Sequence, residues 1–503
     1  MDRVLPASLH KSISYFLFDV VYPLEKYAAP TVVLVPPFIK SAMETLSEAT
    51  GQDLDTLEYI LGMLICYPLG IILLKLPHGK IKHLFSFLLG AFLLQFTIGV
   101  QWVHQLITSL VAYVLFLTLP RSVTKTLVPA FAMIYMTLGH LHRQFINYLG
   151  YDLDFTGAQM VLTIKLYSIA YNLYDGELIA KNKADRAAKK CQEFALTELP
   201  GIIEFLGYTF CFSNILAGPA YEFKIYADAC DGYLLYDKKT GKPKGKIPSN
   251  IFPALWPLFQ SLIILVIFVI GNGKFPLLDP VNPQTQTPYI LSETFLAMPF
   301  IKRYAYMWIG LFFIRHKYYF AWKNAEGAQN IWYAGFEGFD EQGNPKGWEN
   351  SSNIDILAFE TGSNVKTLSA VWNKKTALWL NRYVYIRTGG SLLATYGMSA
   401  FWHGFYPGYY FFFLSVPLLT FCERLGRAKL SPLFSTGGKW SPWGIVTMVS
   451  TSLIIEYMVV PFQLLAFDWS FACWKSFYFF GHIICIAFYV IVSMLPTPKK
   501  KVQ

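Results

Sequence analysis

Residues 251–270, IFPALWPLFQSLIILVIFVI, form a stretch of twenty amino acids without one charged side chain. A helix of about 20 apolar residues crosses the hydrocarbon core of a bilayer. The whole chain of 503 residues is 54% hydrophobic, 17% aromatic and 15% charged, whereas soluble proteins carry about 25% charged residues. The stretch and the composition together predict a polytopic membrane protein and argue against an ordinary soluble domain.

Nine further apolar runs predict additional membrane helices, and the shorter ones need neighbouring residues to complete a span. With 251–270 they predict an all-α polytopic fold of about ten or eleven transmembrane helices. The nine runs are 57–76, 84–103, 106–119, 127–138, 160–173, 304–320, 392–422, 443–467 and 477–495.

The apolar run 201–219 is expected to be a re-entrant segment. It lies between two basic loops, 181–190 and 238–246, which hold five Lys or Arg residues each. Positive loops favour the cytosolic side, but a single crossing would place these two loops on opposite sides. The run is interrupted at Gly201 and at Gly218-Pro219. A segment that enters and returns on one side resolves the conflict, provided that protein or a cavity surrounds its backbone.

The two ends of the chain differ from the apolar middle. Residues 15–35 are apolar but broken by acidic residues and prolines, which favours an interfacial entry over a firm span. We expect 1–56 to be an N-terminal interfacial or first helical segment, 57–495 the membrane domain and 496–503 a basic cytosolic tail. The last residues, KKKVQ, resemble a dilysine retrieval signal of endoplasmic-reticulum membrane proteins; a solvated basic tail is the alternative. No cleavable signal peptide is predicted.

Several other classes of protein find no support in the sequence. The seven cysteines are scattered, without the spacing of a disulfide framework or of a metal site. Motifs of phosphate loops, dinucleotide-binding turns and serine nucleophile elbows are missing. The net charge of +10 lies in short loops beside apolar runs, so anionic lipid headgroups explain it better than nucleic acid does.

His403 and Asn373 are the candidates for chemistry. His403 lies within a long apolar and aromatic stretch, and an ionisable residue at membrane depth is a functional candidate because it is costly to place there. A neutral imidazole can act as a general base on an alcohol that attacks an acyl carbon. An asparagine amide can stabilise the resulting oxyanion. The structural alternatives are a histidine bonded to a carbonyl and an asparagine that caps a helix.

A basic, aromatic segment follows Asn373. Its guanidinium and ammonium groups suit phosphates, including those of coenzyme A, although an interfacial helix that meets anionic lipid heads has the same pattern. The segment contains Lys374, Lys375, Arg382 and Arg387, interspersed with Trp379, Tyr383 and Tyr385.

These motifs resemble the membrane-bound O-acyltransferase family. The match is Trp372-Asn373 in a basic segment, followed thirty residues later by His403 in Trp402-His403-Gly404. The stretches 154–160, 174–176, 217–223, 336–339 and 402–409 resemble the lysophospholipid acyltransferase branch, and the broad-specificity fungal enzymes in particular.

The resemblance implies an enzyme of the endoplasmic-reticulum membrane with a central catalytic chamber and a cytosolic C-terminus. It would transfer a fatty acyl chain from acyl-CoA, its co-substrate, to the free hydroxyl of a lysophospholipid, without a cofactor, a metal or nucleic acid. His403 would be the general base and Asn373 its catalytic partner. Residues that would bind substrate are Trp372, Lys374, Lys375, Arg382 and Trp402.

Three alternatives to this function remain at this point. The same chemistry can act on a sterol, a diacylglycerol or a protein. A non-catalytic membrane scaffold would tolerate the loss of His403. A lipid transporter would use acidic residues along its pathway, for which the candidates are Asp175, Glu204, Glu222, Glu423 and Glu456.

Overall fold

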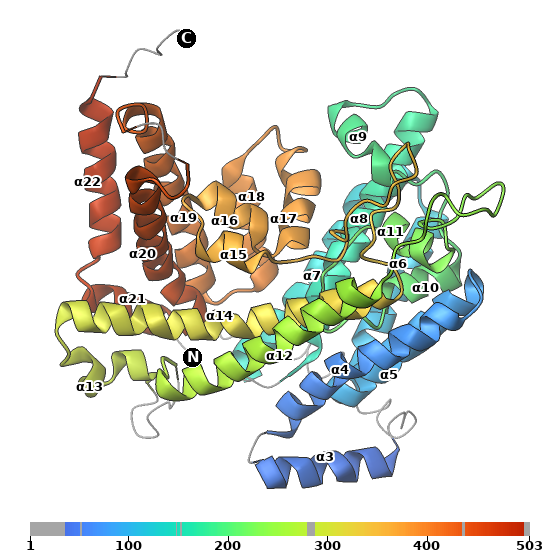
Figure 1. Ribbon diagram of the computed structural model, residues 1–503, viewed down its shortest axis with the longest axis horizontal. Coiled ribbons are helices and arrows are strands. Elements are labelled where there is room, and N and C mark those ends of the chain that lie inside the picture. The colour runs from blue at the N-terminus through green and yellow to red at the C-terminus, as the bar shows by residue number, and fades with distance from the viewer. Residues whose placement is uncertain are drawn as a thin grey trace, which may run out of the picture. The chain divides into compact units, whose positions relative to one another are not determined.

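The computed structural model describes residues 36–50, 53–146, 148–150, 153–278, 287–434 and 438–496. Over these residues the chain is helical, and the only extended pairings are two isolated bridges. Figure 1 follows the helices in chain order. The prediction of an all-α fold is therefore confirmed. The expected interfacial segment 15–35 and tail residues 497–503 lie outside the described residues.

The chain divides into two compact units. Unit 1 comprises Met1–Gln260 and Ala321–Ser352, and unit 2 comprises Ser261–Phe320 and Asn353–Gln503. Two of the three points of division fall within long helices, α12 (Ile251–Lys274) and α14 (Phe300–Ile331), and the third falls between Ser352 and Asn353.

Unit 1 holds the first half of the helices. They are α3 (Pro37–Thr50), α4 (Leu54–Lys75), α5 (Lys80–Ile98), η2 (Gly99–Trp102), α6 (Val103–Thr118), α7 (Arg121–Ile146), α8 (Phe155–Ala180), α9 (Arg186–Lys190), η3 (Gln192–Phe194), α10 (Ile202–Thr209) and α11 (Phe223–Cys230).

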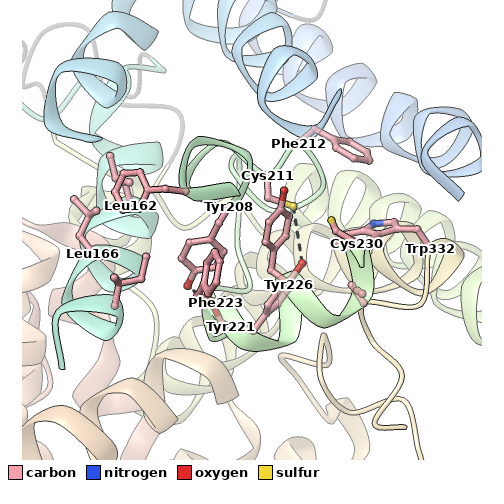
Figure 2. Close-up of a cluster of buried hydrophobic side chains, with 14 of the residues drawn as sticks. Leu162, Leu166, Tyr208, Cys211, Phe212, Tyr221, Phe223, Tyr226, Cys230 and Trp332 are labelled. Atoms are coloured by element: carbon pink, nitrogen blue, oxygen red, sulfur yellow. Dashed lines mark hydrogen bonds between the residues drawn. The ribbon is translucent and has the colours of Figure 1, made fainter. Parts of the chain in front are cut away.

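An aromatic cluster forms the core of unit 1 (Figure 2). The ring of Tyr208 on α10 lies 5.4 Å from that of Phe223 and 5.6 Å from that of Tyr226, both on α11. The fully buried Lys165 on α8 donates from Nζ to the carbonyl of Tyr208 at 2.8 Å and to Oδ1 of Asn214 at 2.7 Å. Because its ammonium group finds acceptors, this buried charge can fasten α8 to the chain around α10.

The apolar run 201–219 is not a continuous helix. It forms the eight-residue α10 and then a series of turns that leads to α11. The interruption expected from its glycines and proline is therefore present. A return to the same membrane side remains a prediction.

Unit 2 holds the remaining helices besides parts of α12 and α14. They are η4 (Tyr289–Leu291), α13 (Glu293–Leu296), α15 (Ile356–Glu360), α16 (Val365–Val371), α17 (Lys374–Leu380), the π-helical turn η5 (Asn381–Tyr385), α18 (Leu392–His403), α19 (Pro407–Lys429), α20 (Pro442–Leu464), α21 (Phe467–Ser476) and α22 (Phe480–Met494).

The helices of unit 2 pack closely around α19 and α20. A Cβ atom at Gly408 would lie only 2.0 Å from the carbonyl oxygen of Pro461, so a glycine is needed where α19 begins against α20. His482 joins three helices, because its Nδ1 lies 2.9 Å from Oη of Tyr457 on α20 and its Nε2 lies 3.0 Å from Oγ of Ser415 on α19. These contacts hold α19, the helix that follows His403, in place.

Fewer helices meet the length and apolarity of a membrane span than the sequence predicts. Among the described residues four do, Leu54–Lys75, Lys80–Thr118, Ile251–Lys274 and Pro442–Leu464, or five if α21 and α22, bent by 66°, make one span. The predicted number of about ten or eleven was higher. The long helices α8 and α14 are less apolar because they carry charged residues such as Lys165 and Arg315. The run 392–422 breaks at Gly404 into α18 and α19.

Candidate active site

His403 is the last residue of α18, and Gly404 ends the helix. Gly404 has φ of 116°, a conformation that favours glycine. Nδ1 of His403 lies 2.7 Å from the carbonyl oxygen of Ser399, one turn earlier. A carbonyl only accepts, so Nδ1 carries the hydrogen and the lone pair of the neutral ring lies on Nε2. This contact is the bond to a carbonyl that a purely structural histidine would make. It also fixes the tautomer that a general base needs.

Aromatic rings surround the half-buried imidazole of His403. Ring centroids of Phe413 on α19 and Phe462 on α20 lie 5.2 and 5.1 Å away, and those of Trp402 and Tyr409 lie 4.7 and 5.6 Å away. Such walls restrict water around a reactive group.

Asn373 stands at the start of α17 in a left-handed conformation, with φ 45° and ψ 50°, which asparagine tolerates better than most residues. It occupies the cap position, but its side chain makes no capping bond. The capping alternative is therefore wrong for the side chain.

Asn353 supplies the bonds that the start of α17 needs. Its side-chain Oδ1 accepts a hydrogen bond from the backbone N of Lys375 at 2.9 Å. Its backbone carbonyl oxygen accepts one from the backbone N of Lys374, also at 2.9 Å. Its Nδ2 donates to Oδ1 of Asn373 at 3.1 Å. A backbone N–H can only donate, which fixes the direction of both amides. Asn373 accepts through Oδ1 and keeps Nδ2 as its donor. Local sequence does not reveal this contact, because Asn353 lies twenty residues earlier.

Trp372 belongs to an aromatic cluster rather than to an open surface. Its ring centroid lies 4.8 Å from that of Phe359 on α15 and 5.8 Å from those of Tyr318 and Tyr319 on α14. Trp372 therefore anchors the turn that contains Asn373.

The segments that carry the two catalytic candidates are linked within unit 2. Trp379 on α17, 2% exposed, lies 6.2 Å from Trp402 on α18, ring to ring. Trp402 in turn meets the ring of His403 edge to face. Lys374 and Lys375 open α17, and Arg382 lies in η5, all three half-buried.

Structural partners bind Glu204, Glu222, Glu423 and Glu456, which were considered for a transport pathway. Their bonds lie within one unit or the other and hold helix ends or pairs of helices together. These bonds are from the N of Gly201 to Glu204, from Asn172 to Glu222, from the N of Val365 to Glu423, and from Arg315 to Glu456. Over the described ranges, no three His, Cys, Asp or Glu residues are placed to hold a metal ion.

Comparison with known proteins agrees with the resemblance noted in the sequence. A model of the membrane-bound O-acyltransferase family matches residues 140–462, which include both Asn373 and His403. The chain is 29% identical over 473 residues to the lysophospholipid acyltransferase of Schizosaccharomyces pombe, covering 90% of this chain and 88% of that protein. It is also 29% identical over 483 residues to the lysophospholipid acyltransferase of Saccharomyces cerevisiae, covering 90% and 76%.

An animal relative has a similar degree of identity. Membrane-bound glycerophospholipid O-acyltransferase 2 of Gallus gallus is 30% identical over 474 residues, which cover 92% of this chain and 89% of that protein. The apolar helices, the family match and these relatives lead to one conclusion: the chain is a polytopic membrane protein that belongs to the membrane-bound O-acyltransferase family.

Proposed function

We propose that this enzyme transfers a fatty acyl chain from acyl-CoA to the free hydroxyl of a lysophospholipid. The support is the length of the match to relatives named lysophospholipid acyltransferase, which extends over 90% of the chain. The structural observation that carries the mechanism is the bond from Nδ1 of His403 to the carbonyl of Ser399, which leaves Nε2 as the basic atom.

His403 is assigned as the general base. Its Nε2 takes the proton of the lysophospholipid hydroxyl while that oxygen attacks the thioester carbon. The tetrahedral intermediate carries its negative charge on the former carbonyl oxygen. Collapse breaks the carbon–sulfur bond, and the departing coenzyme A thiolate takes the proton from the imidazolium. The products are a phospholipid, free coenzyme A and a regenerated imidazole.

Asn373 is assigned as the donor to the oxyanion. Its Oδ1 already accepts from Asn353, so Nδ2 is the group that can donate. An oxyanion donor acts on the transition state more than on the substrate. Loss of the Asn373 amide is therefore expected to lower kcat rather than to raise KM.

The basic residues near Asn373 are assigned to the acyl-CoA head. Lys374, Lys375 and Arg382 offer charge-assisted hydrogen bonds to its phosphates. Trp372 and Trp402 pack against other rings, which supports a role in shaping the site. We further propose that residues 57–495 form the acyltransferase domain, in the endoplasmic-reticulum membrane with the C-terminus in the cytosol.

The test is release of coenzyme A by purified protein in detergent, with oleoyl-CoA and a panel of lysophospholipids. Loss of a general base costs about 10²–10⁴-fold in rate, so His403→Ala should be almost inactive while remaining folded. His316→Gln is the control. In the wild type, Nδ1 of His316 also lies 2.7 Å from the backbone carbonyl oxygen one turn earlier, that of Phe312.

The panel also separates the alternatives. A sterol or a diacylglycerol that supports turnover where every lysophospholipid fails would contradict the proposed acceptor. Folded wild-type protein that releases no coenzyme A with any acceptor would contradict acyl transfer itself. His403→Ala with wild-type turnover would remove His403 from the mechanism.

A further inference from the structure

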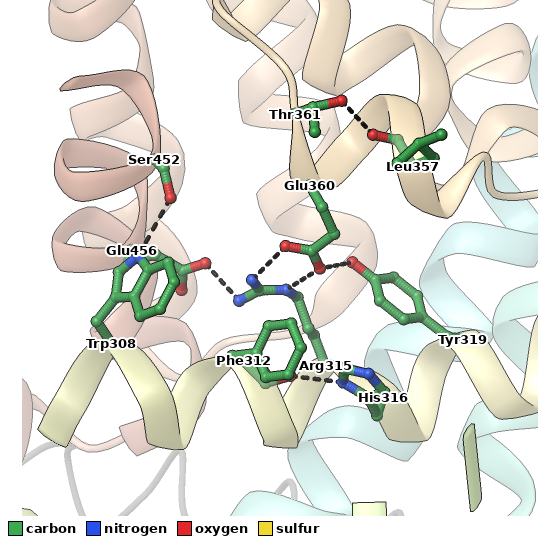
Figure 3. A network of polar contacts seen from close by, with 10 residues as sticks. All are labelled: Trp308, Phe312, Arg315, His316, Tyr319, Leu357, Glu360, Thr361, Ser452 and Glu456. Carbon is green, nitrogen blue, oxygen red and sulfur yellow. Dashed lines mark hydrogen bonds and ion pairs between the residues drawn. The ribbon is translucent and has the colours of Figure 1, made fainter. Parts of the chain in front are cut away.

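Arg315 on α14 lies at the centre of a largely buried ion network in unit 2 (Figure 3). Its Nε and Nη2 each donate to one carboxylate oxygen of Glu360 at 2.7 Å, as a two-pronged pair. Its Nη1 donates to Glu456 on α20. Tyr319, one turn further along α14, donates from Oη to Oε1 of Glu360 at 2.7 Å.

Stability alone is a weak explanation for this network. The side chains of Arg315 and Glu456 are each 8% exposed and that of Glu360 is 23% exposed, and one guanidinium faces two carboxylates. Taking charges out of water costs several kcal/mol per ion, and well-packed apolar residues are often as stable as a buried ion pair. A two-pronged pair does, however, fix the geometry of both partners. The network is best explained by what it holds in place.

Glu360 is the last residue of α15, next to Phe359. The ring of Phe359 lies 4.8 Å from that of Trp372, and the ring of Tyr319 lies 5.8 Å from it. Trp372 directly precedes Asn373. Glu360 is thus joined to both rings, to Phe359 through the chain and to Tyr319 through a hydrogen bond, against which the Trp372 side chain packs.

The segment 353–360 runs along the Asn373 turn and contacts it at three points. Asn353 bonds Asn373 and the first two residues of α17. The backbone N of Asp355 donates to the carbonyl of Val371 at 3.1 Å. Phe359 packs on Trp372. One end of this segment is fixed by Asn353, and the other end is fixed to α14 through Glu360.

We propose that Glu360, held by Arg315 and Tyr319, is a positioning residue for Asn373. It acts through the segment 353–360, which keeps the backbone of Asn373 in its left-handed conformation and the Asn373 amide in its direction. This inference rests on the proposed function. Glu360 itself is not assigned to contact substrate.

Glu360→Gln, Arg315→Met and Arg315→Lys test the network. Misplacement of a catalytic group by about 1 Å can cost 10²-fold, so we expect kcat to fall roughly tenfold to hundredfold in all three. KM for oleoyl-CoA and for the lysophospholipid should stay within about twofold, because only the transition state loses a contact. Arg315→Lys keeps the charge but loses the planar fork, so wild-type kcat in this variant would contradict the geometric argument.

Glu456→Gln is the matched control. Glu456 binds the same guanidinium from α20 and does not belong to segment 353–360. Its replacement makes the same change of charge at the same arginine, and kcat should stay within about twofold of wild type. Equal losses of kcat in Glu456→Gln and Glu360→Gln would overturn the proposal, since the network would then act only as general support.

A double-variant experiment gives the sharpest answer. If Glu360 acts through Asn373, Glu360→Gln should lower kcat in the wild-type background but add nothing in an Asn373→Ala background. The same fold-loss in both backgrounds would overturn the proposal. Phe359→Leu removes none of the hydrogen bonds or ion pairs of the network, although its ring lies 6.0 Å from the Arg315 guanidinium. It should reproduce the loss of kcat, so it tests the same path if Glu360→Gln does not fold.

The two proposals fail in different ways. Coenzyme A release by wild type, with full kcat in folded Glu360→Gln and in Phe359→Leu, would overturn the positioning role and leave the proposed function standing. Absence of release from wild type, with every acceptor, would overturn both.

Discussion

Replacement of Asn353 by aspartate gives a direct test of how the Asn373 amide is oriented. Asparagine at 353 donates to Oδ1 of Asn373 and accepts from the backbone N of Lys375. An aspartate carboxylate can only accept. It keeps the bond from Lys375, but it forces Asn373 to turn its Nδ2 towards residue 353. Asn373 then presents Oδ1, an acceptor, where the oxyanion needs a donor.

The expected fall in kcat is that of a lost oxyanion donor. Removing one oxyanion donor costs about 10²–10³-fold in kcat, so Asn353→Asp should be as impaired as Asn373→Ala. Asn353→Ala is a different perturbation, because it breaks both side-chain bonds of a residue that is 1% exposed. At about 1 kcal/mol net for each bond, it should lose about 2 kcal/mol of stability.

Steady-state release of coenzyme A, detected with a thiol reagent, measures kcat, and intrinsic tryptophan fluorescence on heating measures stability. Wild-type kcat in a folded Asn353→Asp variant would refute the assigned role of the Asn373 amide. A loss of kcat that simply follows the loss of stability, with Asn353→Ala the worse of the two, would refute the argument from orientation.

Three further outcomes follow from packing and protonation, each read from thermal unfolding. Gly408→Ala should be strongly destabilised, because its Cβ would lie 2.0 Å from the carbonyl oxygen of Pro461; an unchanged midpoint would contradict the close approach. Lys165→Met should lose about 3 kcal/mol of stability, because it removes the donor of three hydrogen bonds to buried oxygens; a neutral effect would show that water replaces the amine. Burial, with Lys82 as a smaller cause, lowers the pKa of His78, in the turn between α4 and α5. Its neutral form is therefore favoured on folding, so this contribution to stability is present above about pH 6.5 and declines as the pH falls. His78→Gln should lessen that decline between pH 7 and pH 5, and identical curves would contradict it.

The sequence identified the residue types that chemistry needs but not what orients them. His403 and Asn373 stand out because their side chains are unusual in their surroundings, and the spacing of the two motifs matches a family. Asn353 carries no such signal, because its bonds to Asn373 and Lys375 join segments twenty residues apart. The pairing of Arg315 with Glu360 is equally invisible, because α14 and α15 meet only in the folded unit.

Hydropathy found the helices, but fewer of the described helices have the length and apolarity of a membrane span than it predicts, for a related reason. A run of apolar residues shows that a segment is buried, but burial inside protein and burial in lipid have the same composition. Lys165 on α8 illustrates the difference, since its ammonium group is fully buried and bonded to carbonyl and amide oxygens. Such residues reveal protein surroundings only once their partners are known.

The place of His403 at the very end of α18 makes that helix sensitive to its length. Each residue of an α-helix turns the chain by about 100° and advances it by about 1.5 Å. Deleting one residue between 392 and 402 would rotate the imidazole away from its aromatic walls, whereas most substitutions there would leave its direction unchanged. The segment from Ser391 to Gly404 must therefore keep its number of residues if His403 is to keep its direction. In the course of evolution, insertions and deletions are expected in the turns on either side of it.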